Sequence, residues 1–193
     1  MGRYEAAVAA IDAANADDPH TLVIDGVAQP KELTHAAMAV AWVQRLDPAA
    51  TEAQLLAARA HHLRRWVTPR SAYPEGRAGY LRWRSDAKRR HAAEVAEILG
   101  SVGYGDAEVA RVQQIVRKEG VRHDPQVQTH EDALCLVFLE TQFGDLIDRL
   151  GEAHAVDVVR KTVAKMSDAG IAAALQLSLS DAEASVLDAA TSE

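Results

Sequence analysis

The segment of residues 130–150 places apolar side chains on nearly every side of a predicted helix, and it constrains the fold more than any other. A helix that is hydrophobic all round lies inside a protein, with other elements packed around it. Crossing a membrane needs an uninterrupted apolar run of ~18 residues or more, and the sequence contains none. We therefore expect Thr129 to cap a central core helix that other helices cover.

Most of the remaining chain repeats its apolar residues at helical spacing. We expect helices over residues 4–15, 31–46, 51–64, 80–99, 106–116 and 153–167, with long loops at 66–79 and 120–128. One short β-like piece, residues 21–27, precedes the second helix and contains an Asp-Gly turn signal. The pattern predicts an all-α protein, a single helical bundle of about seven helices over residues 1–180. The Ala- and Ser-rich residues 181–193 are expected to form a frayed tail.

The chain has one cysteine, Cys135, so it can form no internal disulfide and no cysteine-cluster zinc site. Its first residues lack a basic segment followed by an apolar block, unlike a secretory signal. These features favour a cytoplasmic protein with no membrane partner.

Positive charge is concentrated in residues 59–91 of a chain whose net charge is −7. That stretch has ten cations and two anions, whereas the remainder has eleven cations and 26 anions. Nine of the ten cations are arginines, whose planar guanidinium binds phosphate in two places. The alternatives are a solvated helix face and an anion site, and we favour a phosphate site.

Arginines alternate with aromatic residues in the loop and the helix that follow Trp66. Cations suit phosphate and rings suit a base, although Trp66, Tyr80 and Trp83 could instead fix the loop to the bundle. The expected phosphate- or substrate-binding residues are Arg64, Arg65, Arg70, Arg77, Arg84, Tyr73 and Tyr80.

Four histidines lie in or at the ends of predicted helices, and an acidic pair, Glu131 and Asp132, opens the core helix. The order His35, His61-His62, His91, Asp132 resembles the HD superfamily of metal-dependent phosphohydrolases. The resemblance implies an HD-like bundle in which these residues hold one divalent ion (Mn, Fe, Ni or Zn), with Glu131 able to replace Asp132. The family's His-Asp pair is absent, because His62 follows His61 and Leu63 follows His62.

Four strings, AARAHHLRRW, PRSAYPEGRAGYLRWR, VQTHEDALCLVFLE and KTVAKMS, also resemble an uncharacterised family, domain of unknown function family 4202. This resemblance covers residues 4–177. It implies no activity, but it favours His62, His91 and Asp132 as the metal ligands over His61 and His35.

Two functions follow from these patterns. The first is a divalent-metal-dependent, HD-like phosphohydrolase that acts on a nucleotide or another phosphorylated small molecule. The alternative is a non-catalytic helical domain that binds metal, nucleotide or, less favoured, RNA. A third reading assigns no ligand and treats the chain as a purely structural helical adaptor.

Overall fold

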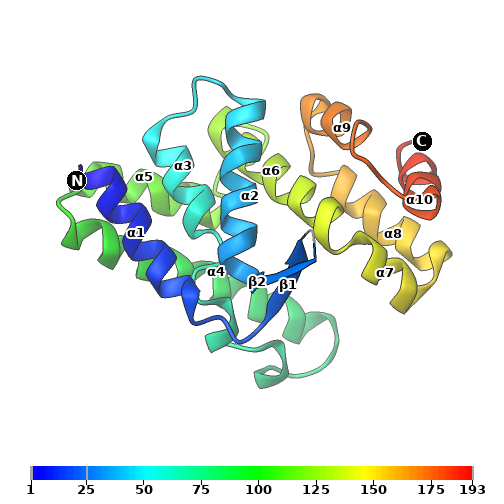
Figure 1. The fold of residues 1–193 in the computed structure, drawn as a ribbon, viewed down its shortest axis with the longest axis horizontal. Helices are drawn as coiled ribbons and strands as arrows, with labels where there is room; N and C mark the ends of the chain where they lie inside the picture. Colours follow the sequence, from blue (N-terminus) through cyan, green and yellow to red (C-terminus); the bar gives the residue numbers. More distant parts are fainter. Residues whose placement is uncertain (1, 25, 193) are drawn as a thin grey trace.

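The computed structural model describes residues 2–24 and 26–192 and confirms the all-α fold class (Figure 1). The described residues form one β-hairpin, ten α-helices and two short 3-10 turns. In chain order they are α1 (Arg3–Ala16), β1 (Thr21–Ile24), β2 (Val27–Pro30), α2 (Lys31–Leu46), α3 (Glu52–Ala60), η1 (Arg65–Val67), η2 (Arg70–Ala72), α4 (Gly76–Ser101), α5 (Asp106–Arg117), α6 (Pro125–Thr141), α7 (Phe143–Leu150), α8 (Glu152–Val163), α9 (Asp168–Ala174) and α10 (Asp181–Thr191).

The helices pack around two hydrophobic clusters that lie side by side. One cluster joins α1, α3, α4 and α5 through buried residues such as Ile11, Leu56 and Ile115. The other joins α2 with α6 to α10, and Phe143 and Leu187 are buried in it. In Figure 1 the first group lies on the left with the N-terminus, the second on the right with the C-terminus, and α2 runs between them.

The β-like piece at residues 21–27 is the first half of an antiparallel hairpin. β1 pairs with β2 from Thr21 opposite Pro30 to Ile24 opposite Val27. Asp25, half of the predicted turn signal, lies outside the described residues. The hairpin leads directly into α2, which spans residues 31–46 as predicted.

Two boundaries of the central helix differ from the prediction. Asp124, rather than Thr129, caps α6, and its carboxylate accepts hydrogen bonds from the backbone of Gln126 and Val127. The Thr129 hydroxyl instead donates back to the Pro125 carbonyl within the first turn. At the other end Gln142, at φ −134° and ψ 0°, separates α6 from α7, so residues 130–150 form two helices.

The frayed tail expected at residues 181–193 is wrong for the described part of that segment. Residues 181–191 form α10, which opens with a capping box between Ser180 and Glu183. Val186, Leu187 and Ala190 are buried in the cluster that includes α8. The segment is rich in Ala and Ser, but its apolar residues recur at helical spacing and form one buried face.

The predicted loop at 66–79 is shorter than expected because α4 begins at Gly76. Arg70 donates hydrogen bonds to the carbonyls of Tyr73 and Pro74 and so closes the loop on itself. Gly79 lies against the same turn, and a Cβ there would be 1.9 Å from the Pro74 carbonyl oxygen. Among the described residues, no helix is both long and apolar enough to cross a membrane.

Candidate functional site: a basic, histidine-lined cavity

A cavity of about 640 Å³ opens between α2, α4, α5, α6, α8 and the turn after α3. Its volume lies within the range of small-molecule sites. The histidines and charged side chains of its wall fall into three sets: imidazoles, cations and one carboxylate. They are His35, His61, His62 and His91; Arg65, Arg84, Lys88, Lys118, Lys161 and Lys165; and Glu131.

Glu32, His35 and His62 form a possible metal-binding group at one end of the cavity. Their ligand atoms lie within 4.8 Å of one another, and across residues 2–24 and 26–192 no other set of three does so. Glu32 and His35 are buried, and Glu32 Oε2 lies 3.0 Å from His62 Nδ1 and 3.7 Å from His35 Nδ1. Two imidazoles and a carboxylate suit divalent transition metals.

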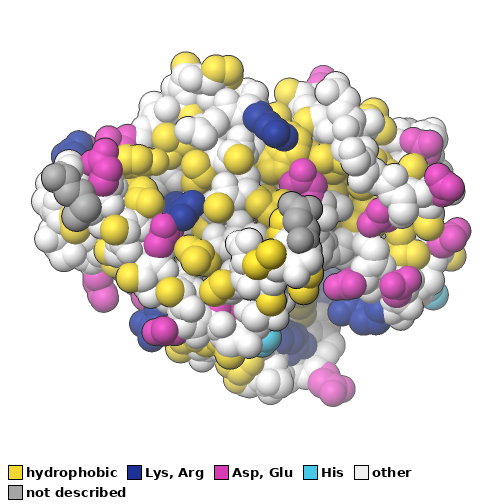
Figure 2. Space-filling model, in the orientation of Figure 1, with side chains coloured by type: hydrophobic (Ala, Val, Ile, Leu, Met, Phe, Trp, Pro, Cys, Tyr) yellow, Lys and Arg dark blue, Asp and Glu magenta, His cyan; other side chains and the backbone are white. Residues whose placement is uncertain are grey.

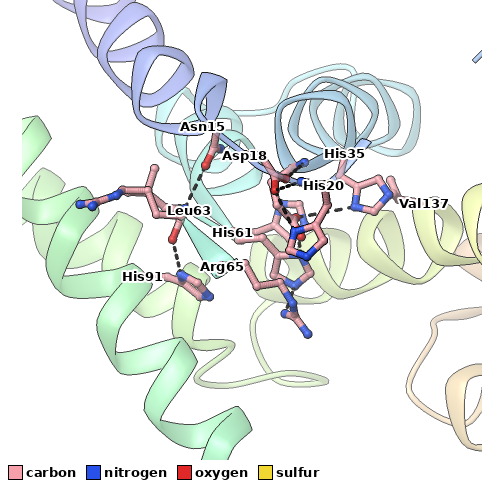
Figure 3. A network of polar contacts seen from close by, with 12 residues as sticks. Asn15, Asp18, His20, His35, His61, Leu63, Arg65, His91 and Val137 are labelled. Carbon is pink, nitrogen blue, oxygen red and sulfur yellow. Dashed lines mark hydrogen bonds and ion pairs between the residues drawn. The ribbon is translucent and has the colours of Figure 1, made fainter. Parts of the chain in front are cut away.

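Asp18 fixes the position of Glu32 from the loop before the hairpin. Its carboxylate accepts a hydrogen bond from the Glu32 backbone N–H at 2.8 Å and another from the His20 backbone N–H. Asp18 therefore satisfies a free N–H in the first turn of α2, where Pro30 provides no side-chain cap. Figure 3 shows the contact between Asp18 and His20 as a dashed line.

The hydrogen bonds of the two imidazoles determine their tautomers. His62 Nε2 lies 2.7 Å from an Arg65 guanidinium nitrogen, which can only donate, so Nδ1 carries the proton and donates to Glu32. The Thr141 hydroxyl donates to the Val137 carbonyl, so His35 Nε2 is the donor to Thr141 Oγ1. In the neutral form of this imidazole Nδ1 carries the lone pair, and that nitrogen faces Glu32 Oε2 at 3.7 Å.

Four imidazoles lie one beside the next, and three of them, His61, His62 and His91, line the cavity. Ring centroids are 6.0 Å apart between His91 and His62, 4.1 Å between His62 and His61, and 6.4 Å between His61 and His130. Burial lowers all four pKa values: that of His91 to about 4, that of His130 to about 3, and those of His61 and His62 well below the usual value. The row is therefore neutral at physiological pH.

His91 presents a free acceptor to the cavity. Its Nδ1–H donates to the Leu63 carbonyl at 2.7 Å, which leaves the lone pair on Nε2. That nitrogen is buried and has no hydrogen-bond partner among the described residues. A buried polar atom without a partner carries a free-energy cost, which a bound ligand or water can remove.

Two of the cations in the wall, Arg65 and Lys118, are held in place by neighbouring side chains. Arg65 lies between His62 and Trp83, with its guanidinium carbon 4.7 Å from the Trp83 ring centroid. Lys118 ends α5 in the left-handed conformation, at φ 59°, and its ammonium is 2.5 Å from Glu131 on α6. A left-handed backbone costs a lysine free energy and is frequent at functional sites.

The cavity brings together some of the predicted residues. The metal candidates His35, His61, His62 and His91 line it, as do Glu131, Arg65, Tyr80 and Arg84. Asp132 does not: its carboxylate accepts hydrogen bonds from the Ser167 N–H and hydroxyl and from Gln128, and it holds the start of α9. Among the described residues, the ligand atoms of the predicted trio, His62, His91 and Asp132, therefore do not form a group of three within 4.8 Å.

Four predicted phosphate-binding residues also lie outside the cavity wall. Arg70 binds loop carbonyls, and the Tyr73 hydroxyl donates to Asp86. Arg64 and Arg77 are exposed, and the backbone N–H of Arg64 donates to Asn15. On the face seen in Figure 2, Lys and Arg side chains occur in small separate groups, and a histidine lies beside such a group at the lower edge.

Sequence reasoning missed five residues of the site: Glu32, Lys88, Lys118, Lys161 and Lys165. Two of them had a usable signal: Glu32 precedes His35 by three residues on a predicted helix and so shares its face, and Lys88 is the one lysine of the basic stretch 59–91. The lysines come from three different helices or their ends, and no local pattern links them.

The fold and the site together define an all-α protein with a basic cavity and a buried Glu/His/His group. The chain belongs to the family described as Domain of unknown function (DUF4202), whose model matches residues 5–187 and so nearly the whole chain. This confirms the family resemblance seen in the sequence. No curated protein and no solved structure matches the chain.

Proposed function

We propose that the protein is a divalent-metal-dependent phosphohydrolase that acts on a phosphorylated small molecule, with nucleotides as the favoured class. The observation that carries the proposal is the Glu32, His35 and His62 group at the end of a cavity lined by six cations. Metal ligands beside cations are a combination that can stabilise the charge that develops in phosphate ester hydrolysis.

The donor set fits a divalent ion in its composition and in the tautomer of His35. A bound ion would supply a Lewis acid for a phosphoryl group and for the attacking water. His62 fits once Arg65 moves, because its Nδ1 proton now faces Glu32 and Arg65 holds the Nε2 lone pair. Neutral imidazoles ligate metals, and the lowered pKa of His62 keeps it neutral.

The remaining roles follow from the cavity wall. Arg65 and Arg84 would orient the phosphoryl group, and His91 Nε2 would accept the proton of the attacking water. The water oxygen forms a bond to phosphorus as the ester bond from phosphorus to oxygen breaks. The leaving oxygen takes a proton from solvent, and inorganic phosphate is the second product.

Aromatic rings at the rim favour a nucleotide. Tyr80 and Trp83 line the cavity with their ring centroids 6.0 Å apart, and Trp83 is anchored through its indole N–H to the Thr68 carbonyl. An anchored ring can stack on any of the bases, because each base has a flat π-face.

The test combines metal content with turnover. The purified protein is expected to bind about one equivalent of Mn, Fe, Ni or Zn and to release phosphate from a panel of nucleoside phosphates. Glu32→Gln should abolish both, whereas Arg77→Gln, an exposed cation outside the cavity, should change neither. A chain that binds no divalent ion and releases no phosphate from the panel would overturn the proposal.

A specific observation favours a second function, non-catalytic binding of a phosphorylated ligand. Arg65 occupies His62 Nε2 and so holds the imidazole in the tautomer that does not ligate at Nδ1. If that contact persists with ligand bound, nucleotides will raise the melting temperature without any phosphate release or metal uptake.

A further inference from the structure

We call the part of the cavity around Glu131, which Lys88, Lys118 and Lys165 line, its lysine end. Lys88 projects from the middle of α4, Lys118 from the end of α5, and Lys165 from the turn after α8. All three side chains are partly buried and line the same cavity. The cavity therefore gathers ammonium groups from three separate segments of the chain.

The positive charge at this end is not neutralised by the protein. Glu131 is the single carboxylate of the cavity wall among the described residues, and it pairs with Lys118. Lys88 and Lys165 have no carboxylate within ion-pair distance in residues 2–24 and 26–192. Burial and the nearby Lys118, Arg84 and Lys165 lower the pKa of Lys88 while Glu131 raises it, so one carboxylate faces several cations there.

Crowding like charges in a partly buried wall costs free energy unless a ligand of opposite charge compensates for it. Glu131 already pairs with Lys118, so the positive charges of Lys88 and Lys165 remain without a carboxylate partner of their own. The phosphoryl group assigned to the metal end would compensate for Arg65 and Arg84, so the two remaining lysine charges would need a second anion.

We infer that the lysine end is a second anion subsite, and that the natural ligand carries two phosphate or carboxylate groups, one for each end of the cavity. The inference rests on the proposed function only for the identity of the group at the imidazole end. The apolar wall formed by Val116, Leu134 and Val137 would cover the part of the ligand that links the two anions.

Tungstate, a phosphate-shaped oxyanion, provides a probe that needs no knowledge of the ligand. Calorimetry on the full chain is expected to count two tungstate ions, and anomalous density in soaked crystals should place one beside Lys88 and Lys165. Lys88→Gln and Lys165→Gln should each weaken that ion at least about tenfold and leave the other in place. Arg82→Gln, an exposed cation of the same helix outside the cavity, is the matched control and should retain both.

A second comparison tests the ligand class. Adenosine 3′,5′-bisphosphate should bind more tightly than the 5′-monophosphate, and Lys88→Gln should remove most of that difference while circular dichroism shows an intact fold. A single tungstate ion at the imidazole end, or a lysine-end ion that is insensitive to both variants, would overturn the inference even if the protein hydrolyses phosphate esters. Two tungstate ions in a chain without hydrolysis would overturn only the proposed function.

Discussion

The guanidinium of Arg65 lies 2.7 Å from His62 Nε2 and also stacks on the ring of Trp83. The same cation thus fixes the tautomer of a metal-ligand candidate and faces the cavity where phosphate would bind. Metal and phosphate binding are coupled if an arriving phosphate draws Arg65 away from His62, because the released imidazole can then move its proton to Nε2.

Arg65→Met should therefore strengthen metal binding and weaken phosphate binding. The variant frees His62 to ligate through Nδ1 and removes a positive charge beside the ion. We expect metal affinity to rise about tenfold, in the range of changes that second neighbours of a metal produce. Titration calorimetry with Mn²⁺ and with phosphate measures both, and a fall in the two affinities together would contradict this coupling.

Glu32→Gln and Asp132→Asn should separate the ligand set of the structure from the set that the sequence favoured. The first removes the carboxylate shared by His35 and His62, so metal content should fall from about one equivalent to none. The second lies outside the group and should leave metal content unchanged. Elemental analysis of the two proteins decides, and loss of metal in Asp132→Asn alone would restore the sequence-based set.

Asp132→Asn should instead lower the free energy of unfolding. Its buried carboxylate accepts from the Ser167 backbone and hydroxyl and from Gln128, and an amide cannot accept all three. The expected loss is about 1–3 kcal/mol, since buried groups would be left unsatisfied. Urea unfolding measures it. In a cycle with Ser167→Ala the two losses should be less than additive, and full additivity would mean that the contact contributes nothing.

Stability should fall on acidification because buried histidines are neutral in the folded state. The pKa of His130 drops to about 3 and that of His91 to about 4, so below pH 6.5 the unfolded chain binds protons that the folded chain does not. The loss is roughly 1 kcal/mol per histidine between pH 6.5 and 5.5, continues down to the folded-state pKa, and is absent above pH 7.

His130→Leu isolates one of these contributions. Both ring nitrogens of His130 are buried without hydrogen-bond partners, so leucine sacrifices no contact of that kind. Urea unfolding between pH 5 and 8 should show a shallower acid loss in this variant than in the wild type. Parallel pH curves for the two proteins would contradict the neutral assignment of His130.

Gly79→Ala and Gly100→Ala should act in opposite directions within α4. A Cβ at Gly79 would overlap the Pro74 carbonyl oxygen at 1.9 Å, so the 68–75 loop must move and the melting temperature should fall by several degrees. Gly100 has nothing within 4 Å of a Cβ, and alanine there should stabilise the helix by about 0.5–1 kcal/mol. Thermal unfolding of both variants provides the comparison.

Helix bounds were predicted well where residues at the two ends of the segment themselves start and stop the helix. Pro30 and Asp47 bound α2, which begins and ends where predicted. The start of α6 was displaced because Asp124 precedes a proline that suits the first helical position. The C-terminal helix was missed because its stability comes from burial of Val186 and Leu187, which composition does not reveal.

The kinds of residue at the site were predicted better than the groups with which each residue interacts. The four histidines meet at one cavity, as their shared position in helices suggested. Arg70 was misjudged because a guanidinium that binds carbonyls of its own loop has the same sequence signature as one that binds phosphate. Lys118 could not be found because its direction depends on a left-handed residue at a helix end and on Glu131 from another helix.

Leu63 directly follows His62, and its side chain is completely buried in the first core cluster. Its carbonyl, meanwhile, orients His91. Replacing Leu63 by aspartate would bring a charge into hydrocarbon, so a carboxylate at this position would first require repacking of that half of the protein. Position 63 therefore serves the cavity through its backbone carbonyl alone, while its side chain is committed to the core.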